Sequence, residues 1–184
     1  MSAPPFPADG ARAARRARMI RVDHAGEFGA VQIYKGQRAV FDAIPAKART
    51  AALIADMEAG EHEHLATFDR LIAAEQIRPT VMAPLWRIAG FGLGAATALM
   101  GEKAAHACTA AVEEVIEQHY DAQVRALGDE DGDLRETIAR FRADESAHKE
   151  TALNEGAAEA VGYPVLSALI KFGCRAAIAI SERV

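Results

Sequence analysis

Hydrophobic positions along most of the chain recur every three to four residues, which is the spacing of one face of an α-helix. The stretch 47–76 shows this best, because its apolar side chains share one broad face with Glu61 and His64. Comparable patterns cover 11–41, 102–126 and 133–160. Proline and glycine residues separate these stretches, as expected for connections between helices. The pattern predicts an all-α helical bundle.

Two further segments are more apolar than the others. The stretch 83–101 carries one charge, Arg87, and three glycines interrupt it. A charge and glycines are unfavourable in a membrane span, so a buried bundle helix or one lying in a membrane surface is favoured. The helix expected after Pro164 is apolar on one side and basic on the other. It either packs on the bundle or touches lipid.

The length of 184 residues suits one domain with a substantial core. Residues 1–10 contain three prolines and a glycine, which predicts a disordered N-terminal segment. Residues 11–184 are then expected to form a single domain. No secretory signal pattern is recognisable, because no long apolar run follows the first charges.

Composition narrows the function classes. The net charge of −5 gives no electrostatic case for nucleic acid binding. Five arginines between positions 12 and 21 form a basic segment that we expect to be exposed. Cys108 and Cys174 are far apart, which favours packing residues in a reducing compartment over a disulfide framework.

Two glutamates are each followed by a histidine three residues later, namely Glu61 by His64 and Glu145 by His148. In a helix this spacing places both side chains on one face, where they can bind one ion. A single pair of this kind would mean little, since an isolated glutamate or histidine on a helix is usually a surface residue.

An internal repeat strengthens the case for a metal site. Glu27 precedes Glu61 by 34 residues, and Glu113 precedes Glu145 by 32. Tyrosines follow the lone glutamates by seven residues in both halves, at Tyr34 and Tyr120. The two matching halves predict two similar helical hairpins around a shared centre.

Together these residues form the ligand set of ferritin-like di-iron bundles, in which two helices each give a glutamate and two others each give Glu-x-x-His. Two divalent cations would neutralise four carboxylates whose burial is otherwise costly. Carboxylate and imidazole without thiolate suit iron or manganese, and zinc is a competitor. Asp144 could support a histidine ligand from across the site, although a solvent-facing aspartate is equally expected. Neighbouring acids and histidines are second choices because of their helical phase: Glu58, His62, Glu63, Glu114, Glu117 and His119.

Several segments resemble the demethoxyubiquinone hydroxylase family. The first is Arg21-Val22-Asp23-His24-Ala25-Gly26-Glu27-Phe28-Gly29-Ala30, followed by Ile33-Tyr34. Further matches are Arg78-Pro79-Thr80, Pro84-Leu85-Trp86, Ala107-Cys108-Thr109, Val112-Glu113-Glu114 and Ser181-Glu182-Arg183. The resemblance runs from about residue 18 to the C-terminus.

The resemblance implies a ferritin-like four-helix bundle with additional apolar or amphipathic helices. It implies a di-iron monooxygenase, a 3-demethoxyubiquinol 3-hydroxylase, that uses O2 and NADH to hydroxylate a ring carbon of a 2-polyprenyl-3-methyl-6-methoxy-1,4-benzoquinol. Tyr120 matches a family tyrosine near the metals. The family's six ligands fall on Glu27, Glu61, His64, Glu113, Glu145 and His148.

A lipid-soluble quinol also implies a peripheral membrane protein. It is expected on the cytoplasmic face of a bacterial membrane, with the matrix side of the mitochondrial inner membrane as the less favoured alternative. The apolar helix, the C-terminal helix and the N-terminal arginines are the candidates for membrane contact. No glycine-rich dinucleotide fingerprint follows a strand, so the chain's own residues do not support NADH binding. A homo-oligomer and a partner protein of the ubiquinone pathway both remain open.

Two alternatives keep the metal site but change the function. An iron-storage or ferroxidase protein uses related ligands, yet forms a soluble cage and does not need the apolar helix. A peroxide-reducing protein of the rubrerythrin type normally carries a cysteine-rich electron-transfer module, which two scattered cysteines cannot provide.

Overall fold

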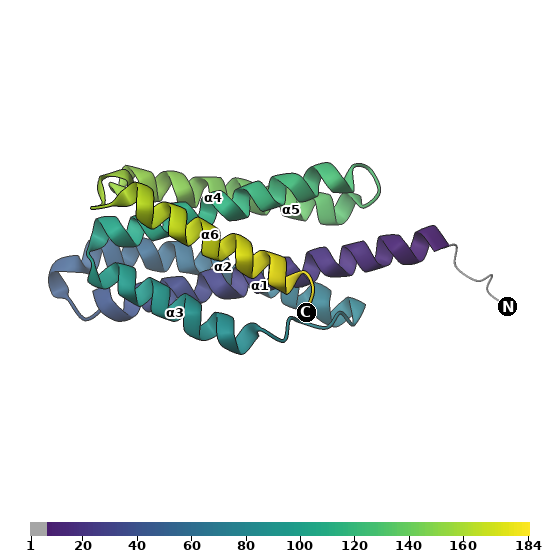
Figure 1. Cartoon of the computed structure of the whole chain (residues 1–184), viewed down its shortest axis with the longest axis horizontal. Helices are drawn as coiled ribbons and strands as arrows, with labels where there is room; N and C mark the ends of the chain where they lie inside the picture. The colour runs from purple at the N-terminus through teal and green to yellow at the C-terminus, as the bar shows by residue number, and fades with distance from the viewer. Residues whose placement is uncertain (1–6) are drawn as a thin grey trace.

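A computed structural model describes residues 7–184 of the chain (Figure 1). That part contains six α-helices, two short 3₁₀ turns and no strand. The helices are α1 (Pro7–Phe41), α2 (Ala48–Glu75), α3 (Ala83–Leu99), α4 (Glu102–Leu127), α5 (Gly132–Asn154) and α6 (Tyr163–Ser181). The 3₁₀ turns are Pro45–Lys47 and Ala157–Glu159. The prediction of an all-α fold is confirmed.

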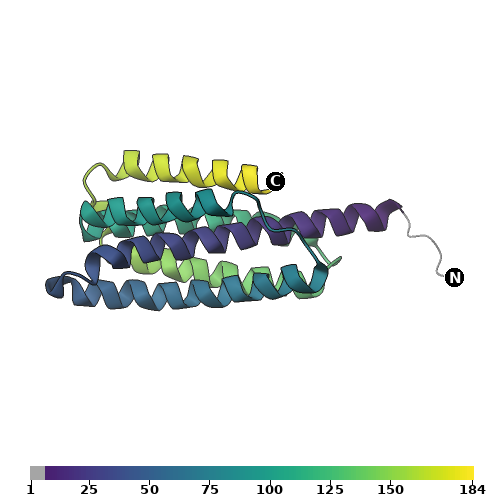
Figure 2. The same ribbon diagram turned by 90° about the horizontal axis from the view of Figure 1, so that it is seen from below.

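Two helical hairpins form the bundle, α1 with α2 and α4 with α5. Helix α3 packs on α1, and α6 packs on α4. In Figure 2, α6 and α3 lie on one side of the molecule, and α2 and α5 lie on the other. Helix α4 is buried along most of its length and forms the centre of the core. Apolar α3 and α6 are therefore the additional helices expected beside a four-helix bundle.

Glycines let α3 approach α1 closely. A Cβ atom on Gly94 would lie 2.0 Å from the carbonyl oxygen of Ile33, and one on Gly36 would lie 2.2 Å from that of Phe91. Such separations are impossible for real atoms, so only glycine fits these two positions. Gly94, one of the glycines that weaken a membrane span, thus serves the contact between two helices.

Helix ends differ from the prediction at two places. The chain is helical from Pro7 onward, so the boundary expected between residues 10 and 11 is wrong, while the rest of the expected disordered segment lies outside the described residues. Proline is compatible with a helix start because the first turn needs no N–H partner. Helix α5 ends at Asn154 rather than near 160, because Gly156 adopts a φ of 87°. The single domain over residues 11–184 stays a prediction.

Several arginines near the start of α1 contact acidic groups. The Arg16 guanidinium binds both Glu75 at the end of α2 and Asp131 before α5. Arg15 binds Glu130, and Arg21 donates to the carbonyl oxygen of Arg78 at 2.8 Å. These contacts join the start of α1 to the end of α2 and to the α4–α5 hairpin. Arg15, Arg16 and Arg21, three of the arginines expected to contact the membrane, therefore have partners within the protein.

Large apolar side chains are exposed on α3 and α6. Ile88 on α3 and Phe172 on α6 are each 73% exposed, and Leu85, Phe91, Val165 and Leu169 accompany them. Helix α3 has 17 residues. Within the described residues, α6 is the one helix long and apolar enough to cross a membrane, and 17% of that stretch is buried. The exposed apolar surface is therefore spread over two neighbouring elements.

Candidate metal centre

The six side chains singled out by the repeat meet in the middle of the bundle. They come from four helices, α1, α2, α4 and α5, and five of them are buried, with His148 partly exposed. Their potential ligand atoms form two groups, in each of which all atoms lie within 4.8 Å of one another. The first group is Glu27, Glu61, His64 and Glu145, and the second is Glu61, Glu113, Glu145 and His148.

Glu61 and Glu145 belong to both groups, so they lie between the two positions. The Nδ1 atom of His64 lies 3.2 Å from Glu145 Oε1 and 3.5 Å from Glu27 Oε2. The Nδ1 atom of His148 lies 2.9 Å from Glu61 Oε1 and 3.4 Å from Glu145 Oε2. Each histidine thus faces the shared carboxylate of the opposite hairpin as well as its own.

Eight buried ligand atoms in this centre have no hydrogen-bond partner in the described part of the chain. They are Glu27 Oε2, both oxygens of Glu61, His64 Nδ1, Glu113 Oε2, both oxygens of Glu145 and His148 Nδ1. Buried polar atoms normally have partners, and an unpaired buried carboxylate is strongly unfavourable. Six oxygens and two imidazole nitrogens around two positions are a donor set that suits a pair of divalent cations. The residues therefore fit two metal ions.

The pKa values show how strongly burial and neighbouring charges act on the carboxylates and imidazoles of the centre. Burial raises the pKa of both Glu27 and Glu113, and the charges of Glu145 and Glu61 raise them further. Burial also raises the pKa of Glu61, but contacts with His148 and His64 outweigh it and bring the value to about 2. Burial lowers the pKa of His148, yet Glu145 and Glu61 raise it to about 9. The imidazoles and the buried carboxylates of the centre thus strongly shift one another's pKa values.

The two tyrosines of the repeat contact the lone glutamates. Tyr34 donates from its hydroxyl to Glu113 Oε1 at 2.7 Å, and Tyr120 donates to Glu27 Oε1. Each tyrosine therefore binds the glutamate of the other half, not the one seven residues before it. In both carboxylates this leaves Oε2 for the centre.

The outer surroundings of the two histidines differ. Asp144 Oδ2 lies 3.1 Å from His64 Nε2, as hypothesised, although the aspartate side chain is also 50% exposed. Gly60, which precedes Glu61 as Asp144 precedes Glu145, lies against the ring of His148, where a Cβ atom would be 3.4 Å from Nε2. The ligands repeat between the halves, but the residue behind each histidine does not.

The second-choice residues lie outside both groups. Glu58 binds Arg38, Glu114 binds Lys171 and Glu117 binds Lys149, so these three carboxylates have cationic partners. Helical phase alone predicted that these residues are second choices as ligands. Their contacts with cationic side chains agree with that prediction. Asp23 is a buried acid that we did not select, although it lies one turn before Glu27.

An apolar cavity of about 560 Å³ lies beside the centre, between α1, α3, α4 and α6. Small residues of α1, among them Gly26 and Gly29, form one wall, and Tyr120 belongs to another. A Cβ atom on Gly26 or Gly29 would meet nothing within 4 Å, so both glycines open directly onto this space. Periodicity could not predict the cavity, because it arises from the way four helices pack.

The fold and this centre define a helical bundle whose buried carboxylates and imidazoles could hold metal ions, the ligand arrangement of the ferritin-like metal proteins. The chain belongs to the family of the ubiquinone biosynthesis protein COQ7, whose model matches residues 14–181. The resemblance seen in the sequence is thereby confirmed.

Similar proteins include the 3-demethoxyubiquinol 3-hydroxylase of Rhodospirillum rubrum, 49% identical over 179 residues, which cover 97% of this chain and 83% of that protein. The human NADPH-dependent 3-demethoxyubiquinone 3-hydroxylase, mitochondrial, is 45% identical over 171 residues, 91% of this chain and 77% of that protein. The 5-demethoxyubiquinone hydroxylase, mitochondrial, of Saccharomyces cerevisiae is 40% identical over 190 aligned positions, 95% of this chain and 80% of that protein.

Proposed function

We propose that this protein is a 3-demethoxyubiquinol 3-hydroxylase of ubiquinone biosynthesis. It would hydroxylate a ring carbon of a 2-polyprenyl-3-methyl-6-methoxy-1,4-benzoquinol with O2. The observation that carries the proposal is the set of eight unpartnered ligand atoms beside an apolar cavity. Family membership and the names of the relatives support the same substrate class.

Two iron ions are the cofactor that we propose. Glu27, Glu61, His64 and Glu145 would hold one ion, and Glu61, Glu113, Glu145 and His148 would hold the other. When bound, iron supplies the redox chemistry with O2 that carboxylates and imidazoles cannot perform. Glu61 and Glu145 keep the two positions together, and the tyrosines orient Glu27 and Glu113.

The substrate would occupy the apolar cavity. Its walls expose almost entirely carbon atoms, which suits a ring with a prenyl chain and excludes bulk water from the reacting face. Tyr120 belongs to both the cavity wall and the metal centre, through Glu27. None of the carboxylates that would hold the ions lines the cavity, so Tyr120 is the contact between a ring in this space and the centre. We propose Tyr120, which matches a family tyrosine near the metals, as a residue for electron transfer between the ring and the metal centre.

We propose peripheral membrane binding through α3 and α6. The cavity lies between these helices and α1 and α4, so a quinol could enter from lipid without crossing water. The exposed apolar side chains on both helices would enter the acyl region of one leaflet. The similar protein from Rhodospirillum rubrum supports a bacterial setting, and we propose the cytoplasmic face of the cell membrane.

Electrons would come from a reduced nicotinamide nucleotide. The resemblance suggested NADH, whereas the names of the human and Dictyostelium discoideum relatives state NADPH. A side-by-side assay with both nucleotides decides between them. A homo-oligomer and a partner protein of the pathway remain predictions.

The experiment is hydroxylation of a short-chain demethoxyubiquinone analogue by the iron-loaded protein, with reductant and O2, followed by mass spectrometry. We expect a product heavier by one oxygen atom, with label from ¹⁸O2. The variants Glu113→Ala and His148→Ala should lose iron and hydroxylation together. Glu117→Ala on the same helix as Glu113 is the control, since Glu117 binds Lys149 outside the centre.

Two results would contradict this function. Full hydroxylation by a variant that has lost its iron would exclude the metal centre from the reaction. A large hollow particle filled with iron, with no hydroxylated product, would establish the iron-storage alternative.

A further inference from the structure

We propose that the hydrogen bond between Trp86 and Ser181 is a latch that joins α3 to α6 beside the apolar cavity and limits the rate at which the substrate enters and leaves. The inference rests on the proposed function and deepens it, because it identifies two residues that control access of the quinol to its site. Trp86 lies in the first turn of α3, and Ser181 is the last residue of α6.

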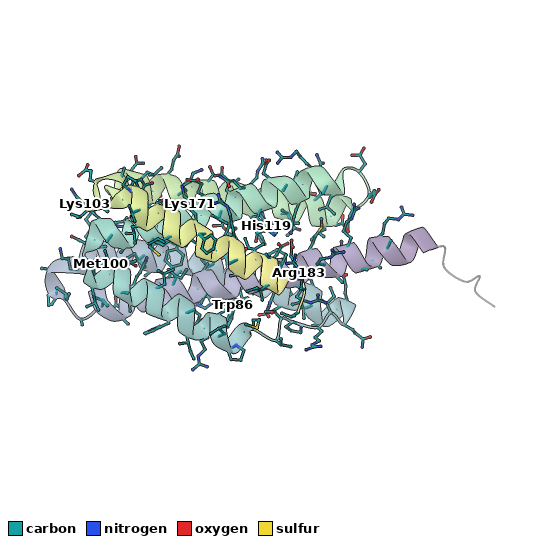
Figure 3. The ribbon with its side chains drawn as sticks, in the orientation of Figure 1. Trp86, Met100, Lys103, His119, Lys171 and Arg183 are labelled. Atoms are coloured by element: carbon teal, nitrogen blue, oxygen red, sulfur yellow. The ribbon has the colours of Figure 1, made fainter. Side chains whose placement is uncertain are left out.

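Helices α3 and α6 form two walls of the cavity but belong to different parts of the bundle. Helix α3 packs mainly on α1 and α6 mainly on α4, and the two pack little on each other. In the described part of the chain, the bond from Trp86 Nε1 to Ser181 Oγ, 3.0 Å long, is the only hydrogen bond or ion pair between them. Figure 3 shows Trp86 beside the end of α6, where Arg183 is labelled. This bond is therefore the polar link between the two walls.

The α3 side of the latch is firmly attached to α1. Before α3, Arg21 of α1 donates to the carbonyl oxygen of Arg78 at 2.8 Å. Within α3, Gly94 lies so close to α1 that a Cβ atom there would be 2.0 Å from the carbonyl oxygen of Ile33. Trp86 lies between these two attachments, so its backbone has a fixed position on α1.

The α6 side has fewer attachments near the latch. Lys171 binds Glu114 of α4 at 2.6 Å, in the middle of α6. After Ile170, the next buried residue of α6 is Ser181. Four residues of the intervening stretch line the cavity: Gly173, Cys174, Ala177 and Ile178. Because segments with few buried contacts open at low free energy, the last turns of α6 can move away from Trp86 while the helix stays bound at Lys171.

Opening of the latch would widen the path to the substrate site. Trp86 and Ser181 both line the cavity, as does Tyr120, which contacts the metal centre. Phe172 of α6 and Ile88 of α3 are exposed on the two helices that the latch joins, so a gap between these helices would open where we propose contact with lipid. The latch thus lies between the proposed source of the quinol and its site.

The bond has a defined kinetic effect. It joins two protein groups and involves no substrate atom, so it opposes opening equally before and after the ligand binds. A single hydrogen bond between neutral groups makes a modest net contribution, so the closed form is favoured but opening stays frequent. Loss of the bond should therefore speed entry and release by the same factor and leave the affinity unchanged.

The test uses Ser181→Ala, which removes the acceptor and retains the rest of the side chain. Trp86 is the single tryptophan of the chain, and a quinone ring quenches tryptophan emission at close range. Binding of a short-chain demethoxyubiquinone to iron-loaded protein is followed by stopped-flow fluorescence without reductant, so no turnover occurs. Release is followed after addition of excess phosphatidylcholine vesicles, which take up the quinone. We expect both rate constants to rise about 2- to 10-fold, with the same Kd.

The matched control is Ser167→Ala. Ser167 is a buried serine of the same helix, 4% exposed, and it lies outside the cavity wall. This variant should bind and release the quinone like the unchanged protein.

A second variant removes the other partner of the bond. Trp86→Phe keeps an aromatic ring but lacks the donor, and its binding is followed by tyrosine emission, since Tyr120 lines the cavity. If both changes act through one bond, Ser181→Ala should have no further effect in the Trp86→Phe protein. Trp86→Phe also gives an independent measurement if Ser181→Ala does not fold.

The possible results lead to different conclusions. Equal acceleration of entry and release, absent from Ser167→Ala and not additive in the double variant, supports the latch. Unchanged rates, or a weaker Kd without faster entry, would overturn the latch and leave the proposed hydroxylase intact. Failure of the unchanged protein to bind the quinone would overturn this inference and the proposed substrate together.

Discussion

Tyr34 donates a hydrogen bond to Glu113 at 2.7 Å, although the two residues belong to opposite hairpins. Tyr120 makes the equivalent bond to Glu27 in the other direction. Each hairpin thus fixes the carboxylate that the other contributes. The two halves cannot move apart without releasing both lone glutamates, so the bundle's packing and its metal centre are coupled.

Tyr34→Phe should weaken metal binding without unfolding the protein. A hydrogen bond to a charged group contributes about 1.5–3 kcal/mol, so we expect the affinity for the ion near Glu113 to fall about 10- to 100-fold. Competition with a chromophoric chelator measures this directly. Unchanged affinity would show that Glu113 is positioned without the tyrosine.

Glu61→Gln and Glu145→Gln should each remove both ions, because these two carboxylates belong to both ligand groups. His148→Ala, by contrast, changes one group, and elemental analysis should find about one residual ion per chain under mild dialysis. Two ions retained in Glu145→Gln would contradict the shared arrangement.

Gly29→Leu should block the substrate cavity and leave the metal in place. The new side chain would extend into open space, and replacement of a helical glycine tends to stabilise the helix by ~0.8 kcal/mol. We expect hydroxylation to fall at least 10-fold with unchanged iron content and an equal or higher melting temperature. Gly94→Ala is the contrasting variant, since it forces α3 away from Ile33 and should destabilise by ~1–3 kcal/mol.

The metal-free protein should lose stability as the pH rises from about 6.5 to 9. His148 has a folded-state pKa of about 9, above its ordinary value of 6.5, so its contribution is complete below 6.5 and disappears through 9. The raised pKa values of Glu27 and Glu113 act in the same direction. Thermal melts of chelator-treated protein test this, and a melting temperature that climbs over this interval would contradict it.

Phe172→Glu and Ile88→Glu should reduce binding to vesicles. Both side chains are 73% exposed, so a charge there disturbs no core contact but is costly in the acyl region. Sedimentation with phosphatidylcholine–phosphatidylglycerol vesicles should show several-fold less bound protein. Leu153→Glu is the control, since Leu153 is 39% exposed and belongs to α5, a helix on the other side of the bundle from α3 and α6 in Figure 2.

The sequence was informative wherever a relationship is local. Glu61 and His64 share a helix face because of their spacing, and the repeat placed Glu145 and His148 in the same way. The sequence left two interpretations of Asp144 open, namely support of a histidine ligand and a solvent-facing side chain. The structure shows both, because Asp144 contacts His64 and is half exposed. Helical phase could not tell which carboxylate Tyr34 would reach, because the partner depends on how the hairpins meet.

Other features depended on packing that periodicity does not encode. Arg16 looked like part of an exposed basic segment, but α1 is long enough to bring it beside Glu75 and Asp131. The cavity exists because small residues of α1 face two apolar helices. Such a cavity forms where glycines and other small residues leave the space between helices unfilled.

The difference between Asp144 and Gly60 has a consequence for how the two ions behave over time. An anion behind His64 strengthens its donation to a cation and holds the ring in place. The ring of His148 lies against Gly60, which has no side chain to accept from it, and is 16% exposed. We therefore expect an ion held by His64 to stay bound longer, and an ion held by His148 to exchange faster with solvent.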